Sequence, residues 1–322
     1  MNTTSFFITV QDDVALVEER MRAQTGAEHH PDLRVALEHL LSAGGKRIRP
    51  TVVFLAGRML GAPREKLVTL GASVEMLHTA TLVHDDLIDG SLLRRGMPTL
   101  NARWSPAATV LTGDFLFSRA AKLAAETDYL PLMKLFADTL SIIVNGELTQ
   151  LFAARGLIDR ANYYRRIYAK TASLFEMSAL AAAMVSTEDE AVRSAMKSYG
   201  YEIGMAFQIM DDVLDFTGEQ ATMGKPVGSD LLQGLVTLPA IYYAEDFPED
   251  SDLKLLAEGG WGNQERMDRL IKSIRNRDSI DKAVKEAKSY VERALKALEQ
   301  FPGSQERSEL ENLAKYIVDR NI

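Results

Sequence analysis

The stretch Met76-Leu77-His78-Thr79-Ala80-Thr81-Leu82-Val83-His84-Asp85-Asp86-Leu87-Ile88-Asp89 is mostly apolar and ends in an acidic pattern. The same pattern occurs again at Asp211-Asp212-Val213-Leu214-Asp215, after the largely apolar run 206–210. In both stretches apolar residues recur at helical spacing, and a helix that is apolar on most sides is buried. The sequence therefore predicts two buried helices, each with aspartates near its end.

The same helical spacing continues through nearly the whole chain, whereas alternating β-branched runs are rare. Pro63 and Pro106 stand where helices should begin, and Gly44-Gly45 and Gly218 stand where helices should end. We predict one all-α domain over residues 1–322, a large helical bundle around a central cavity. The predicted helices span residues 10–25, 31–43, 48–61, 64–88, 105–126, 129–154, 159–185, 188–217, 229–246, 262–275, 278–300 and 304–320.

Composition excludes several classes of site. The 322 residues contain no cysteine, so disulfides, thiolate zinc sites and cysteine nucleophiles are excluded. The formal net charge of −8 disfavours a nucleic-acid partner. No stretch is long and apolar enough for a transmembrane segment, and Asp12-Asp13 directly after a short apolar run disfavours a signal peptide. We therefore expect a cytoplasmic protein.

The spacing within each acidic pattern predicts metal binding. Helical residues four apart lie about 40° from each other around the axis, so Asp85 shares a face with Asp89, and Asp211 with Asp215. Two such faces brought together would repel unless hard divalent cations lay between them, and oxygen ligands suit Mg²⁺ rather than zinc. We predict that these four aspartates bind Mg²⁺ on a diphosphate.

Two further aspartates belong to the same patterns, and we include Asp86 and Asp212 among the catalytic candidates. The alternative for any single pattern is a solvated or capping acidic cluster at a helix end. Two copies inside apolar helices disfavour that alternative, because unpaired carboxylates in such surroundings are costly.

Cations accompany both acidic patterns. Lys46 and Arg49 follow the Gly44-Gly45 turn, Arg94-Arg95 follows the first pattern, and Lys225 follows the second. Guanidinium groups match phosphate geometry with two parallel hydrogen bonds. Together the cations would neutralise two diphosphates, one held through metals and the other by Arg and Lys alone. The alternative for Lys46 and Arg49 is an ordinary basic helix start.

Polar residues inside the apolar helices leave two interpretations open. His78 lies two turns before Asp85 and is either a hydrogen-bonded core histidine or a binding residue. Lys170-Thr171 and Gln208 interrupt apolar helices, where a lysine either pairs or faces a bound diphosphate. The segment Gly146-Glu147-Leu148-Thr149-Gln150 contains either a satisfied buried pair or residues with a direct role.

With these motifs in this order, the chain from Gly44 to its end resembles the all-trans polyprenyl diphosphate synthases, which are chain-elongating isoprenyl transferases. The resemblance implies an isoprenoid synthase-like fold and two substrates, isopentenyl diphosphate and an allylic diphosphate. It implies that isopentenyl diphosphate is bound by Lys46, Arg49, His78 and Arg95. It implies that the allylic diphosphate is contacted by Arg94, Lys170 and Lys225, while Thr171 and Gln208 face the developing carbocation.

The sequence departs from the family pattern at Leu235, where Gly234-Leu235-Val236-Thr237-Leu238-Pro239 has a neutral residue in place of the usual lysine. A neutral residue there is similar to the catalytic subunits of two-component heptaprenyl and hexaprenyl enzymes. A homodimer and a heteromer with a second subunit both stay open.

Product length should depend on the residues just before Asp85. Ala80 and Thr81 lie about 6–7.5 Å along the helix axis from Asp85, where a bulky side chain would stop a growing chain. Because both are small, we expect a floor set deeper, by Leu77 or by Ile142 and Ile143. The alternative is that the small residues only permit close helix packing.

The small residues one turn before Asp85 would leave room for a long chain. We therefore expect a medium- to long-chain product of about seven to ten isoprene units (about C35–C50), used for a quinone side chain. The alternatives are a shorter geranylgeranyl or farnesyl synthase, a terpene cyclase and a non-catalytic partner subunit. A cyclase needs no isopentenyl site, so Lys46, Arg49 and Arg95 favour elongation. A non-catalytic subunit would be expected to have lost the aspartates.

Overall fold

The structure is a computed structural model that describes residues 5–26, 28–153, 155–156, 158–218 and 226–320. Helices make up most of the described residues. The only strands among these residues form one two-stranded hairpin. The all-α prediction is confirmed. None of the described helices has a stretch long and apolar enough to cross a lipid bilayer.

The chain groups into two compact units, each made of three separate stretches. Unit 1 contains Met1–Thr139, Met177–Lys197 and Gln300–Asn312, and unit 2 contains Leu140–Glu176, Ser198–Glu299 and Leu313–Ile322. The expectation of one undivided domain stays a prediction.

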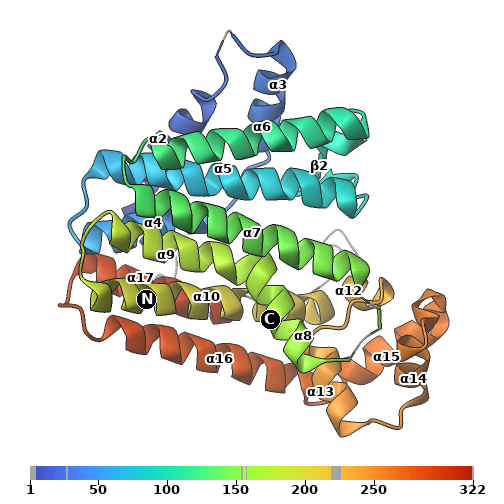
Figure 1. Cartoon of the computed structure of the whole chain (residues 1–322). Coiled ribbons are helices and arrows are strands. Elements are labelled where there is room, and N and C mark those ends of the chain that lie inside the picture. The colour runs from blue at the N-terminus through green and yellow to red at the C-terminus, as the bar shows by residue number, and fades with distance from the viewer. Residues whose placement is uncertain (1–4, 27, 154, 157, 219–225, 321–322) are drawn as a thin grey trace. The chain divides into compact units, whose positions relative to one another are not determined.

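Unit 1 is built around two long antiparallel helices, α5 (Arg64–Ile88) and α6 (Pro106–Ala125), which lie side by side in Figure 1. Ser73 Oγ donates to the carbonyl of Ala120 at 2.8 Å. At the other end a Cβ on Gly113 would lie 2.1 Å from His84 Nε2, so a larger residue there would displace the His84 ring. The other elements of unit 1 are α1 (Ser5–Thr9), α2 (Gln11–Arg22), α3 (Pro31–Ser42), α4 (Ile48–Met59), β1 (Leu93–Arg94), β2 (Met97–Pro98) and η1 (Leu100–Ala102).

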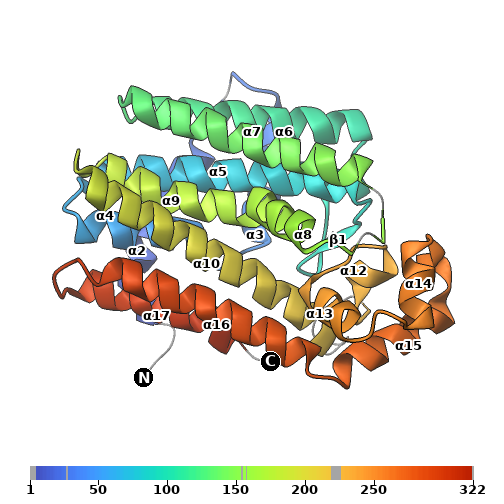
Figure 2. The same cartoon turned by 60° about the horizontal axis from the view of Figure 1, so that its bottom comes forward.

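Four helices cross from one unit's residues into the other's, namely α7 (Leu130–Phe152), α9 (Ser173–Met184), α10 (Glu190–Thr217) and α17 (Gln305–Asp319). The remaining elements belong to unit 2: α8 (Arg160–Ile167), the π-helical turn η2 (Tyr168–Ala172), α12 (Ser229–Leu232), α13 (Leu238–Asp246), α14 (Ser251–Ala257), η3 (Gly260–Gly262), α15 (Gln264–Arg275) and α16 (Ser279–Leu298). Figure 2 shows α13 packed on α16, and α14 beside α15.

Most helix boundaries agree with the sequence prediction, and α5 agrees at both ends. The predicted helix 159–185 is one helical path interrupted by the π-turn η2. The predicted helix 229–246 was wrong, because Gly234 has a φ of +76° and the chain restarts as α13 with Pro239 in its first turn. The hairpin and α14 were not predicted.

The π-turn lies against α10 at very short range. A Cβ on Gly204 would lie 2.6 Å from the Ala172 Cα atom and 2.9 Å from its Cβ atom. Since the neighbour is backbone, it cannot move aside without shifting the turn. Gly204 therefore sets the distance between α10 and the turn that carries Lys170 and Thr171.

We expect Gly204→Ala to lower the free energy of unfolding by about 1–3 kcal/mol, because overpacking displaces the backbone of η2. Urea denaturation measures the change. Gly262→Ala is the matched control, since nothing lies within 4 Å of its added Cβ. Its expected effect is below about 0.5 kcal/mol. Equal stabilities of the two variants would contradict the close-packing argument.

Candidate functional site

A cleft in unit 1 brings together the α3–α4 connection, the middle of α5 and the β1–β2 hairpin. Three predicted binding residues, His78, Arg94 and Arg95, line it. Apolar side chains, among them Leu82 and Met97, line the same cleft. The cleft therefore offers both cationic groups and an apolar wall within one small volume.

The hairpin fixes the two arginines that follow the first acidic pattern. Arg95 and Gly96 form its two-residue turn with φ values of +51° and +76°, the backbone that such tight hairpins require. Arg94 donates from Nε to both carboxylate oxygens of Asp86 at 2.9 and 3.0 Å, and its Nη2 lies 2.8 Å from Oδ1. Asp86 thus holds the hairpin against α5. Contact between Arg94 and an allylic diphosphate stays a prediction.

Arg95 reaches back across the cleft to the glycine turn. Its Nη1 donates to the carbonyl of Gly44. A Cβ on Gly45 would lie 2.6 Å from that same nitrogen, and Gly45 has a φ of +154°. The Gly44-Gly45 pair therefore ends α3 and also leaves room for the guanidinium of Arg95.

Arg47 belongs to the cleft, although sequence reasoning selected only its neighbours Lys46 and Arg49. It adopts a left-handed φ of +46° at the start of α4 and forms ion pairs with Glu18 at 2.9 Å and Glu75 at 2.7 Å. Its Nη2 is buried without a hydrogen-bond partner in the described part of the chain. Lys46 is exposed and Arg49 half-buried. The signal for Arg47 was its position between two predicted cations.

The charges of the cleft are unbalanced toward positive. Burial lowers the pKa of His78 well below 6.5, and the charges of Arg49 and Arg95 lower it further. The pKa of Arg95 is also lowered, by burial and then by the charges of Arg47 and Arg94. Cations that repel one another in this way are stabilised by an anion. His78 is neutral here and can donate a hydrogen bond to that anion.

The first acidic pattern lies at the end of α5. Asp85 is partly exposed and Asp89 is exposed, whereas Asp86 is only 5% exposed. No group of three or more acidic or histidine side chains within the described ranges forms a ready metal site. A divalent cation would therefore be held by one or two carboxylates, with water and phosphate oxygens completing its shell. This oxygen-only donor set fits Mg²⁺.

In unit 2 a chain of hydrogen bonds connects the second acidic pattern to the π-turn. Thr171 Oγ1 donates to Gln208 Oε1 at 2.6 Å, and Gln208 Nε2 donates to Asp212 Oδ1 at 2.8 Å. The hydroxyl of Tyr163 donates to Asp212 Oδ2 at 2.7 Å. The predicted residues Thr171, Gln208 and Asp212 are therefore brought together, with Tyr163 as a fourth member that the sequence did not reveal.

Asp212 is almost completely buried, and its pKa is raised to about 7. Burial is the larger cause, and the charge of Asp230 adds to it. The hydrogen bonds from Tyr163 and Gln208 act in the opposite direction. Asp230 thus belongs to the acidic group at this end of α10.

Asp211 and Asp215, the first and last aspartates of the second pattern, differ in exposure and in their partners. Asp215 is 2% exposed, and its carboxylate accepts hydrogen bonds from Ser229 Oγ at 2.8 Å and from the Asp230 N–H at 3.2 Å. Asp211 is 41% exposed and forms an ion pair with Arg320 at 2.9 Å. Asp215 therefore fixes the start of α12 in this structure. Metal binding by both residues stays a prediction.

The other predicted cations are two lysines, and Leu235 stands where a further lysine is usual. Lys170 forms an ion pair with Glu147 at 3.1 Å, which supports the satisfied-pair interpretation of the Gly146-Glu147 segment. Lys225 lies outside the described residues. Leu235 is half-buried, and its N–H donates to the carbonyl of Asp230 at 2.9 Å.

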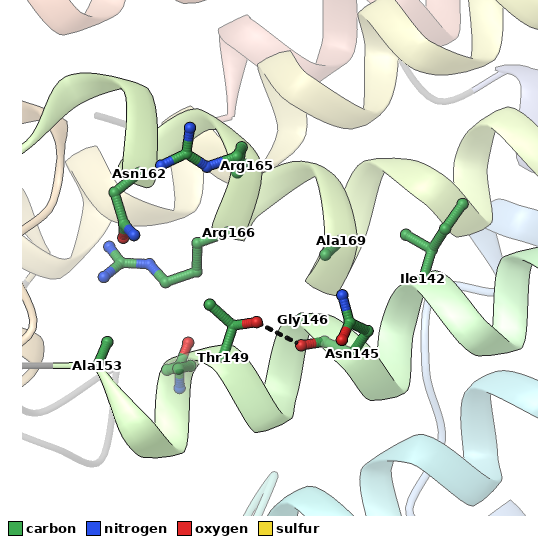
Figure 3. Close-up of a pocket in the computed structure, with 10 residues that line it drawn as sticks. Ile142, Asn145, Gly146, Thr149, Ala153, Asn162, Arg165, Arg166 and Ala169 are labelled. Carbon is green, nitrogen blue, oxygen red and sulfur yellow. Dashed lines mark hydrogen bonds between the residues drawn. The ribbon is translucent and has the colours of Figure 1, made fainter.

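A second cavity lies in unit 2 between α7 and α8 (Figure 3). Asn162 and Arg166 extend from α8 toward α7, where Thr149 donates to the carbonyl of Asn145 at 2.7 Å. The volume is about 190 Å³, which is smaller than the usual ligand cavity of roughly 300–1,000 Å³. This cavity is too small for a long isoprenoid chain, although the predicted floor residue Ile142 lines it.

The predicted chain-length residues lie mainly in the core. Leu77 and Ala80 are completely buried on α5, and Thr81 is half-buried with its hydroxyl donating to the carbonyl of His78 at 2.8 Å. Ile143 is buried on α7. Their control of product length stays a prediction.

Asp212 should make stability depend on pH. Because its pKa is raised in the folded chain, the native state holds a proton between about pH 4 and pH 7 that the unfolded chain has released. This contribution is present at low pH and is lost as pH rises through about 7. Its size is on the order of 2–4 kcal/mol, since one pKa unit corresponds to about 1.36 kcal/mol.

Asp212→Asn should remove this part of the pH dependence, as measured by urea unfolding at about pH 5 and about pH 8. Asp230→Asn removes the neighbouring charge and should move the loss of stability to lower pH. The same pH dependence in wild type and Asp212→Asn would show that the carboxyl of Asp212 does not titrate in this range.

Comparison with known proteins gives a family for this arrangement. Residues 30–274 match the Polyprenyl synthetase family. The chain is 38% identical over 286 residues to the octaprenyl diphosphate synthase of Haemophilus influenzae, covering 88% of this chain and 87% of that protein. It is 37% identical over 323 residues to heptaprenyl diphosphate synthase component 2 of Geobacillus stearothermophilus, with complete coverage of both chains.

Solved structures share the fold. The polyprenyl synthase of Caulobacter crescentus CB15, solved in complex with calcium and isoprenyl diphosphate, superimposes with a TM-score of 0.90 at 34% identity. The match covers 99% of this chain and 98% of that one. The chain therefore belongs to the polyprenyl synthetase family of prenyltransferases.

Proposed function

We propose that this chain condenses isopentenyl diphosphate repeatedly onto an allylic diphosphate and makes an all-trans polyprenyl diphosphate for a quinone side chain. The observation that carries this proposal is the cleft of unit 1, where His78, Arg47 and Arg95 gather beside the first acidic pattern. A cluster of cations with an apolar wall suits a diphosphate bearing a short hydrocarbon tail. A terpene cyclase has no use for such a second diphosphate site.

The length of the product is proposed from two observations. The relatives named above are octaprenyl and heptaprenyl synthases, which supports a product in the range of seven to ten isoprene units, C35–C50. The side chains one turn before Asp85 are the small Ala80 and Thr81, which would leave room for a long chain. A shorter geranylgeranyl or farnesyl product is the alternative.

In this proposal the residues of unit 2 stabilise the charge that develops on the allylic carbon. Thr171 donates its hydroxyl proton to Gln208, so its oxygen offers lone pairs to a neighbouring positive charge. Gln208 donates in turn to Asp212, whose other carboxylate oxygen accepts a hydrogen bond from Tyr163. A fixed dipole of this kind needs no reorganisation during the reaction. The allylic C–O bond breaks, and its electron pair leaves with the diphosphate. The isopentenyl double bond then attacks the allylic carbon, and the proton that is lost to restore a double bond passes to the released diphosphate.

The metal in this proposal is Mg²⁺, which when bound supplies positive charge to the departing diphosphate. Asp85 and Asp89 would bind it on α5, and Asp211 and Asp215 on α10. A cytoplasmic location is also part of the proposal.

We also propose a homodimer. In unit 2, α7 exposes apolar side chains at helical spacing, namely Val144, Leu148, Leu151 and Phe152, and Phe152 is 86% exposed. A stripe of this kind is typical of a protein interface. The alternative is a heteromer with a second subunit, supported by Leu235 and by the relative named as a component 2.

We expect the purified chain alone to form labelled products when it is incubated with Mg²⁺, an allylic diphosphate and labelled isopentenyl diphosphate. The products should contain about seven to ten isoprene units, a range that includes the octaprenyl and heptaprenyl products after which the relatives are named. Asp85→Ala and Asp211→Ala should each lower turnover by at least about a hundredfold, because each removes charge stabilisation of the transition state. Asp268→Ala, at an exposed carboxylate on α15, is the matched control.

The outcomes separate the alternatives. Product from the chain alone favours the homodimer, whereas activity only after addition of a second subunit favours the heteromer. Near-normal turnover of either aspartate variant would refute the metal role of that acidic pattern. Cyclic hydrocarbon without incorporated label would support the cyclase.

Ala80→Phe should shorten the product to roughly three or four isoprene units while catalysis persists, because the ring would block the path about one helical turn from Asp85. Product sizing by chromatography measures this change. Ala80→Ser is the control and should leave product length unchanged. An active Ala80→Phe enzyme with unchanged product length would refute the floor at this turn, and an unfolded one would favour the packing interpretation.

A further inference from the structure

Arg320 closes the end of α17 onto the second acidic pattern. Its Nη1 donates to Asp211 Oδ1 at 2.9 Å, and its Nη2 donates to the carbonyl of Phe207 at 3.0 Å. Its Nε donates to the carbonyl of Ile317, near the end of α17, at 3.1 Å. The guanidinium also stacks over the Phe207 ring, 4.1 Å from its centroid. All these residues belong to unit 2.

This position is built rather than incidental. The Arg320 side chain is only 9% exposed, and every one of its nitrogens has an acceptor. A surface arginine that pairs by chance usually keeps most of its guanidinium in water. The guanidinium is held by Phe207 and Ile317 independently of Asp211, so its charge stays close to this carboxylate even when the carboxylate binds something else.

The surroundings explain why a cation is needed here. Asp211, Asp212 and Asp215 lie at the C-terminal end of α10, where the helix dipole already disfavours negative charge. Asp230 adds its charge close to Asp212. In the absence of a metal, Arg320 therefore offsets repulsion that would otherwise act against the folded state.

The same charge must oppose a metal ion. A divalent cation that binds Asp211 either displaces the guanidinium from Oδ1 or remains a few ångströms from it, and both cost binding free energy. We propose that Arg320 is a positioning residue that restrains metal binding at Asp211 in the substrate-free enzyme. The inference rests on the proposed metal role of Asp211. A diphosphate would relieve the restraint, because it brings negative charge for both cations.

A direct test is the titration of Mn²⁺ in the absence of substrate, with free Mn²⁺ measured by electron paramagnetic resonance. Asp85→Asn serves as the common background, so that the second acidic pattern dominates binding. In this background Arg320→Gln should lower the dissociation constant about fivefold, or ~1 kcal/mol, as expected for the loss of a partly exposed ion pair. Urea unfolding of the metal-free protein should show lower stability in the same variant.

Arg293→Gln is the matched control. Arg293 pairs with Glu202 on the same helix α10 at 2.9 Å, about two and a half turns from Asp211. It should lose some stability without changing Mn²⁺ affinity. Arg320→Lys keeps the positive charge but loses the planar guanidinium, so its Mn²⁺ affinity should lie between those of the background and of Arg320→Gln. This second variant keeps the test valid if Arg320→Gln folds poorly.

Tighter metal binding combined with lower stability would support the restraint, because a purely structural role would weaken both. An unchanged or raised dissociation constant in Arg320→Gln would overturn it. Asp211→Asn separates the two hypotheses. If that variant binds Mn²⁺ as tightly as the background does, the metal role of Asp211 fails. If Asp211→Asn weakens binding and Arg320→Gln leaves it unchanged, only the restraint fails.

Discussion

The ion pair between Asp86 and Arg94 is the interaction on which the cleft of unit 1 depends. It joins the end of α5 to the β1–β2 hairpin through contacts of 2.8–3.0 Å, and its carboxylate is buried. Loss of Arg94, whose side chain is 36% exposed, would leave the buried carboxylate of Asp86 without its charged partner, which is destabilising. The hairpin so fixed presents Arg95 to Gly44 and places its guanidinium in the cleft with His78. A carboxylate of the acidic pattern thus positions a cation of the neighbouring site.

The two acidic patterns are alike in sequence and different in structure. In both, the second aspartate is buried and hydrogen-bonded, Asp86 by an arginine and Asp212 by Tyr163 and Gln208. The last aspartates diverge, since Asp89 is exposed at the end of α5 and Asp215 is buried against Ser229. Asp86 has the charged partner Arg94, whereas the hydrogen-bond donors to Asp212 are neutral, and burial raises the pKa of Asp212 in spite of them. Equal spacing therefore does not imply equal chemistry.

Helical periodicity was sufficient to predict the long helices, because α5 and its neighbours bury side chains at that spacing. It could not predict the hairpin, whose Arg95-Gly96 turn depends on two left-handed residues, one of them not glycine. The partners Arg47, Tyr163, Asp230 and Arg320 were missed for a related reason. Each acts through a contact distant in sequence, such as the 109 residues between Arg320 and Asp211. Pattern and propensity describe local preference, and only the fold brings such pairs together.

Both sites leave charge that the protein alone does not balance, and the imbalance has opposite sign in the two units. In unit 1 burial lowers the pKa of His78, and the charges of the surrounding arginines lower it further, so the cleft is more stable with an anion. In unit 2 carboxylates gather at the end of α10, and Arg320 offsets part of their charge. An anion such as a diphosphate would balance the cleft of unit 1, and divalent cations would balance the carboxylates of unit 2. The fold holds the charged side chains of each site in place before a ligand binds. Binding therefore neutralises charge without having to rearrange these side chains.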